Sequence, residues 1–134
     1  FTVGLDAVNR VTTSGEGETR QVPVRTLDGV VGERTPSMIK IDVEGYEEEV
    51  FKGAGRVLDK PGLMVVEVET VTDEIERQLE SKGFVRAFYD PFKRLLSRTP
   101  VGTHSNNVAY VRGWEAVSER LRSARRINVL GRRI

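Results

Sequence analysis

Four carboxylates stand in two pairs, each at the end of a short apolar run of this 134-residue chain. Asp42 and Glu44 follow the first run, and Glu67 and Glu69 end the second. Carboxylates held close together can bind Mg²⁺ through their oxygens. Alternatively, one carboxylate raises the pKa of its neighbour, which then serves as a base. The sequence leaves both forms of chemistry open.

The residues around Asp42 indicate the elements that position it. The run over 38–42 reads as a strand closed by Gly45, and apolar residues then recur at the spacing of one buried helical face. The residues on this face are Val50, Phe51, Ala54, Val57 and Leu58. Ligands of open α/β sheets bind at the carboxyl ends of parallel strands. We therefore expect Asp42 at such an end.

The remaining periodicity predicts an alternating α/β order. The run over 63–69 is apolar enough for a central parallel strand covered on both faces. Thr26 or Asp28 is expected to cap a short helix, and Thr72 or Asp73 a later one. The other predicted elements are strands at 84–89 and 108–111, a loop with one helical turn at 92–103, and a final amphipathic helix from Trp114.

Composition excludes several classes of function. The net charge is +1, which predicts no general attraction to nucleic acid or to acidic membranes. The chain has no cysteine, so disulfides, thiolate zinc sites and cysteine nucleophiles are absent. No apolar run approaches the roughly 20 residues that span a bilayer. We expect a cytoplasmic protein without nucleic-acid or membrane partners.

The motif IKIDVEG at residues 39–45, the helix-like segment after it, the Pro61 turn and the next strand ending in Glu resemble the FkbM family of methyltransferases. The resemblance runs from about Val22 to Val111 and is strongest over 40–69. It implies transfer of a methyl group from S-adenosylmethionine to a hydroxyl oxygen on a small molecule or sugar.

The resemblance also implies a fold, namely the C-terminal half of a Rossmann-like class I methyltransferase sheet. We expect an α/β architecture of parallel strands with a closing antiparallel strand and helices on both faces. The family's glycine-rich cofactor loop does not occur upstream of Lys40. We therefore expect a single, N-terminally incomplete domain that is inactive alone and pairs with a second copy along the exposed edge of strand 38–42. Its parts are a hairpin or loop with a short helix (1–37), the α/β core (38–111), and a helix with a basic tail (112–134).

Site residues follow from the same resemblance. Methyl transfer to a hydroxyl needs an acceptor held in line and a group that takes its proton. Asp42 is expected to act as base, as hydroxyl orienter or as ligand to the positive end of the cofactor. The predicted catalytic residues are Asp42, Glu44 and His104; the predicted cofactor-binding residues are Asp42, Val43 and Gly45; and the predicted substrate-binding residues are Glu67, Asn106, Asn107 and Tyr46. No metal site is predicted.

Each of these residues also has a structural interpretation. Asp42 has the residue type of a helix cap, and Glu44 in a first helical turn would stabilise the helix dipole. His104, the only histidine, equally suits a solvated loop, and Lys40 points to the face opposite Ile39 and Ile41. Two other functions remain open: a non-enzymatic α/β binding module, and a Mg²⁺-dependent hydrolase that uses Asp42, Glu44 and Glu67.

Overall fold

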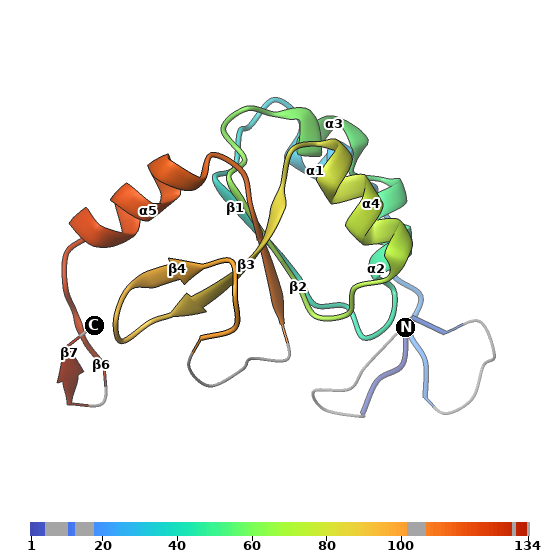
Figure 1. The fold of residues 1–134 in the computed structure, drawn as a ribbon. Coiled ribbons are helices and arrows are strands. Elements are labelled where there is room, and N and C mark those ends of the chain that lie inside the picture. Colours follow the sequence, from blue (N-terminus) through green and yellow to red (C-terminus); the bar gives the residue numbers. More distant parts are fainter. Residues whose placement is uncertain (5–10, 13–17, 102–106, 130, 134) are drawn as a thin grey trace.

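The computed structural model describes residues 1–4, 11–12, 18–101, 107–129 and 131–133. Its centre is a five-stranded mixed sheet in the order β1-β2-β5-β3-β4 (Figure 1). The strands are β1 (Met38–Ile41), β2 (Val65–Val68), β3 (Val85–Asp90), β4 (Leu95–Ser97) and β5 (Val108–Val111). β1 and β2 are parallel, whereas β5 runs antiparallel to both β2 and β3. The predicted closing antiparallel strand thus lies inside the sheet, between β2 and β3.

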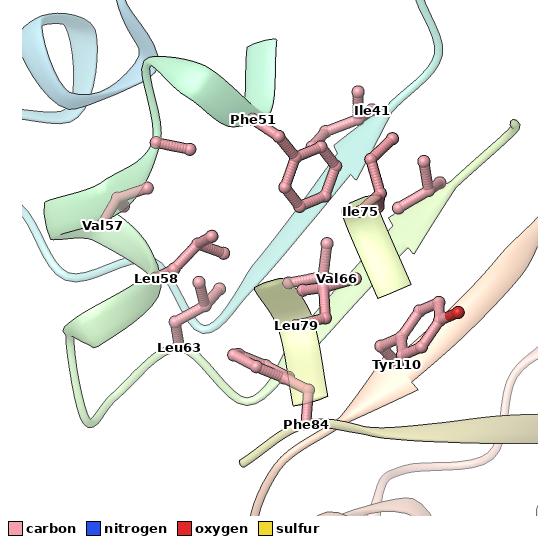
Figure 2. Packing of buried hydrophobic residues seen from close by; sticks show 12 residues of the cluster. Ile41, Phe51, Val57, Leu58, Leu63, Val66, Ile75, Leu79, Phe84 and Tyr110 are labelled. Atoms are coloured by element: carbon pink, nitrogen blue, oxygen red, sulfur yellow. The ribbon is translucent and has the colours of Figure 1, made fainter. Parts of the chain in front are cut away.

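Helices cover both faces of this sheet (Figure 1). One face carries α1 (Leu27–Val31), α2 (Glu47–Lys52), α3 (Gly55–Asp59) and α4 (Asp73–Ser81), and the other carries α5 (Trp114–Ser123). The larger core lies under α2 to α4 (Figure 2) and includes Ile41, Phe51, Leu58, Val66, Ile75, Leu79 and Tyr110. A smaller core under α5 contains Ala87, Val111 and Val117. The alternation of side chains along each strand separates the two cores.

The single helix predicted over 46–58 is two short helices, which is a correction. The helix is interrupted at Gly53. A Cβ added to Gly53 would lie 3.0 Å from Cβ of Thr26. The Asp28 carboxylate accepts hydrogen bonds from the backbone N–H groups of Arg56 (3.0 Å) and Val57 (2.8 Å) at the start of α3. Burial would raise the pKa of Asp28, but these two hydrogen bonds, together with the charge and side chain of Arg56, outweigh it and hold the pKa below its usual value. Thr26 caps α1, as predicted, by accepting from the N–H of Gly29.

The segment predicted as a loop over 92–103 contains the hairpin strand β4 at Leu95–Ser97. Asp90 is buried at the end of β3, and its Oδ1 accepts hydrogen bonds from the N–H groups of Phe92 (3.0 Å) and Lys93 (3.1 Å). This side-chain turn reverses the chain, so β4 pairs antiparallel with β3. The Asp90-Pro91 pair therefore marks a turn within a hairpin rather than the start of a long loop.

The ends of the chain carry short pairings. Thr2 and Thr19 form an isolated antiparallel bridge. Near the C-terminus, β6 (Asn128–Val129) pairs with β7 (Arg132–Arg133). Within the described residues, β1 has a single strand neighbour, and its pairing with a second copy stays a prediction. No described helix has the length and apolar character needed to cross a membrane.

Arg112, directly after β5, ties together loops at the amino ends of the parallel strands. Its guanidinium donates to the carbonyl oxygens of Leu58 (2.9 Å), Leu63 (2.8 Å) and Lys82 (3.1 Å), and also to that of Lys60. It also stacks 4.5 Å from the ring centroid of Phe84. The bonds to Leu58 and Lys82 satisfy carbonyls that the ends of α3 and α4 leave without a helical partner.

Replacing Arg112 with lysine tests this role. One ammonium cannot reproduce the planar fork of donors, so we expect the free energy of unfolding to fall by about 2–3 kcal/mol. Urea denaturation followed by circular dichroism measures the change. Arg122→Lys, at an exposed residue paired with Glu119 on α5, is the control and should cost less than about 0.5 kcal/mol. Equal midpoints for the two variants would contradict this assignment.

Candidate functional site

Three carboxylates meet at the carboxyl ends of β1 and β2. Asp42 directly follows β1, Glu69 directly follows β2, and Glu44 lies in the turn after Asp42. One oxygen from each carboxylate lies within 4.8 Å of the others. We call these three residues the acidic cluster. Its carboxylate oxygens suit a cation, including a hard one such as Mg²⁺. The sequence predicted no metal site, and this stays a prediction.

The parallel pairing of β1 with β2 explains why Glu69 joins this cluster. Ile41 is in register with Val68, and the N–H of Glu69 donates to the carbonyl of Ile41 at 3.1 Å. The ladder therefore continues one residue beyond each strand and sets Asp42 beside Glu69. Glu67, the acid that the sequence favoured, lies two residues before Glu69 and therefore on the same face of the sheet, but its partner in the ladder is Lys40 and not Asp42.

A left-handed turn separates Asp42 from the helix that follows. Glu44 has φ of 52° and Gly45 has φ of 90°, a region that glycine adopts easily and other residues rarely. Because of this turn, α2 begins only at Glu47, with Tyr46 as its N-cap residue. Glu44 therefore does not lie in the first helical turn, and Asp42 does not cap the helix. Both structural interpretations are corrected.

The sequence interpretation missed Glu47, which holds this turn. Its side chain is buried, with the residue 3% exposed, and Oε1 accepts from the N–H groups of Val43 (3.4 Å) and Gly45 (3.3 Å). A signal was present in the sequence. Glu47 stands three and four residues before Val50 and Phe51, so it falls on the buried stripe of the helix. A carboxylate on that stripe must find buried donors.

Lys40 lies between two acids on one face of this sheet edge. Its Nζ lies 2.9 Å from Oδ2 of Asp42 and 3.5 Å from Oε1 of Glu67. Lys40 thus reaches the acidic cluster.

The surroundings of Asp42 and Glu69 shift the pKa values of these two acids in opposite directions. The hydrogen bond and charge of Lys40 hold the pKa of Asp42 below its usual value. Loss of hydration, together with the charges of Glu44 and Asp42, raises the pKa of Glu69. Asp42 therefore stays charged to lower pH, and Glu69 is the stronger proton acceptor.

The predicted substrate-binding residues that the structure describes line two separate hollows. Glu67 and Asn107 line a cavity of about 440 Å³, and Nδ2 of Asn107 donates to Oε1 of Glu67 at 2.7 Å. Tyr46 lines a separate hollow of about 350 Å³ with Gly45, Thr70 and Thr72. His104 and Asn106 lie outside the described residues.

Replacing Lys40 with methionine tests the charge arrangement. Methionine keeps the length of the side chain but removes the ammonium that lowers the pKa of Asp42, so we expect Asp42 to titrate at higher pH. Carboxyl ¹³C chemical shifts followed between pH 2 and 8 measure this (the range spans the usual pKa values of Asp and Glu). Lys52→Met, which removes the partner of Glu49 in α2, is the control. An Asp42 titration that is unchanged by Lys40→Met would refute the pairing.

Comparison with known proteins identifies the family. A family model described as the methyltransferase FkbM domain matches residues 4–89. The match includes β1, β2, the acidic cluster and the turn between β1 and α2. Searches of curated proteins and of solved structures gave no match. Because the family model covers more than half of the chain, the protein belongs to the FkbM methyltransferase domain family.

Proposed function

We propose that this domain takes part in the transfer of a methyl group from S-adenosylmethionine to a hydroxyl oxygen of a small molecule. Membership of the FkbM family supports methyl transfer. The observation that carries the finer proposal is the position of the acidic cluster. It lies at the carboxyl ends of two parallel strands, and Lys40 connects it to a cavity that holds Glu67 and Asn107.

The residues of the turn suit the charge of this cofactor. S-adenosylmethionine carries a positively charged sulfonium and supplies the methyl group that reacts. Asp42 and Glu44 are exposed carboxylates that would balance that charge. The N–H groups of Val43 and Gly45 already donate to Glu47. Val43 and Gly45 would therefore contribute through the shape of the turn rather than as hydrogen-bond donors to a ligand.

The different pKa values of the carboxylates suit them to different roles in methyl transfer. Asp42, which Lys40 keeps charged, would orient the acceptor hydroxyl by accepting its hydrogen bond. Glu69, with its raised pKa, would take the proton of the acceptor hydroxyl, whose oxygen would receive the methyl group that the sulfonium of the cofactor supplies and releases. Glu44 would add negative charge beside both. Catalysis by His104 and substrate binding by Asn106 and Tyr46 stay predictions.

A second function has one observation in its favour. Oxygens of Asp42, Glu44 and Glu69 within 4.8 Å of one another could hold Mg²⁺ for a hydrolytic reaction. The set differs from the one the sequence suggested, since Glu69 replaces Glu67. A binding experiment with Mg²⁺ and with S-adenosylmethionine separates the two functions.

Calorimetric titration of S-adenosylmethionine and of S-adenosylhomocysteine into the chain and into Asp42→Asn tests the proposal. Only the first ligand is a sulfonium, so loss of the Asp42 charge should weaken its binding by up to about fivefold. Binding of S-adenosylhomocysteine, whose sulfur is neutral, should change little. The measured quantity is the ratio of the two affinities.

Asp59→Asn is the matched control, because Asp59 is also an exposed aspartate paired with a lysine, Lys82, at 2.6 Å. It lies at the end of α3, near the amino end of β2, and should leave both affinities unchanged. An equal loss in the two variants would show that net charge, and not the acidic cluster, determines binding. Tight binding of Mg²⁺ without any binding of S-adenosylmethionine would favour the hydrolytic function.

A further inference from the structure

Charge is distributed unevenly along the chain. Up to and including Asp90 there are eleven lysines and arginines against eighteen acids, whereas the chain after Asp90 has ten lysines and arginines against two acids, Glu115 and Glu119. The net charge of +1 is therefore the average of an acidic part and a strongly basic part. A prediction that rests on net charge alone does not describe the surface of either part.

Two basic segments come together at one end of the molecule (Figure 1). The turn between β3 and β4 contains Lys93 and Arg94, and the segment after α5 contains Arg125 and Arg126. The Arg94 guanidinium donates to the carbonyl oxygen of Ala124 at 2.6 Å and so joins the two segments. Arg125 and Arg126 are exposed, and neither forms an ion pair with another residue that the structure describes. Their charges are therefore available to a partner.

Each of these segments also exposes apolar side chains beside its basic pair. Phe92 and Leu95 flank the basic pair of the turn and are 53% and 46% exposed. Ile127 follows the basic pair after α5 and is 57% exposed. We call residues 92–95 and 124–127 the basic end. Single exposed apolar residues are ordinary on protein surfaces, but apolar side chains interleaved with cations are typical of surfaces that bind anionic lipid.

The same residues suit nucleic acid less well. Proteins that bind single strands combine basic residues with aromatic rings on which the bases stack. Leu95 and Ile127 are aliphatic and offer no such ring. The Trp114 ring, at the start of α5, already carries the guanidinium of Arg98 at 4.7 Å from its centroid. The boundary between headgroups and acyl chains, by contrast, accepts aliphatic and aromatic side chains alike.

The charge distribution would also orient the molecule at an anionic surface. The acidic cluster follows β1 and β2, which lie at one edge of the sheet, whereas β4 of the basic hairpin lies at the other edge. An anionic surface attracts the basic end and repels the acidic cluster. The molecule would therefore meet the surface with the basic end and keep the acidic cluster directed away from it.

We infer that the basic end binds the surface of a membrane that contains anionic lipid. Its cations lie among the headgroups, and its exposed apolar side chains reach the boundary of the acyl chains. Because Lys93 is paired with Asp90 at 3.8 Å, Arg125 and Arg126 supply most of the attraction. This interaction goes beyond the function proposed above and requires neither the cofactor nor methyl transfer.

Co-sedimentation with lipid vesicles tests this inference without any cofactor. Vesicles of phosphatidylcholine alone are compared with vesicles in which about one quarter of the lipid is phosphatidylserine. We expect binding to the second kind only, with a steep loss as salt is added. The double variant Arg125→Gln, Arg126→Gln should weaken binding by about tenfold or more. Ile127→Ser, which keeps the charge, should weaken it by about threefold.

The double variant Arg20→Gln, Arg25→Gln is the matched control, because it removes the same charge from two exposed arginines near the N-terminus (Figure 1). It should weaken binding by less than about twofold. Equal losses in the two double variants, equal binding to both kinds of vesicle, or no binding to either would overturn the inference. Tighter binding of a single-stranded RNA oligonucleotide, lost in the Arg125→Gln, Arg126→Gln variant, would overturn it in favour of nucleic acid.

Discussion

The buried carboxylate of Glu47 holds the turn on which the acidic residues depend. It accepts the N–H groups of Val43 and Gly45, and so fixes a turn in which Glu44 and Gly45 both have positive φ. A non-glycine residue in this region carries a conformational cost of order 1–3 kcal/mol. Hydrogen bonds to a buried charged acceptor offset that cost. Without them, the chain after Asp42 would be free to begin its helix earlier and carry Glu44 away from Asp42.

The parallel ladder and Lys40 extend this local constraint to the neighbouring acids at the sheet edge. The bond from Glu69 to the carbonyl of Ile41 sets the ends of β1 and β2 level with each other, so Asp42 and Glu69 lie side by side. Lys40 then joins Asp42 to Glu67 on the α5 face. The edge therefore presents the acidic cluster and, next to it, the cavity that Glu67 and Asn107 line.

Local patterns were enough to predict the elements around the site. The apolar runs predicted β1 and β2, the IKIDVEG motif predicted both the family and the placement of Asp42, and Thr26 and Thr72 were expected as caps. The misses arise from contacts between segments distant in sequence. Thr26 packing on Gly53 divides the predicted helix, and strand register selects Glu69 over Glu67. The pairing of β4 with β3 also depends on the turn after Asp90. Residue types that favour a loop do not show how that loop folds back.

The central claim is that the shape of the turn, and not merely its negative charge, creates the site. The affinity of S-adenosylmethionine for Glu47→Ala and for Glu48→Ala tests this most directly, because each variant removes one carboxylate from the same turn of α2 and only Glu47 holds the turn. We expect Glu47→Ala to lose affinity by about tenfold or more and Glu48→Ala by less than about twofold. Equal losses in the two variants would contradict the account.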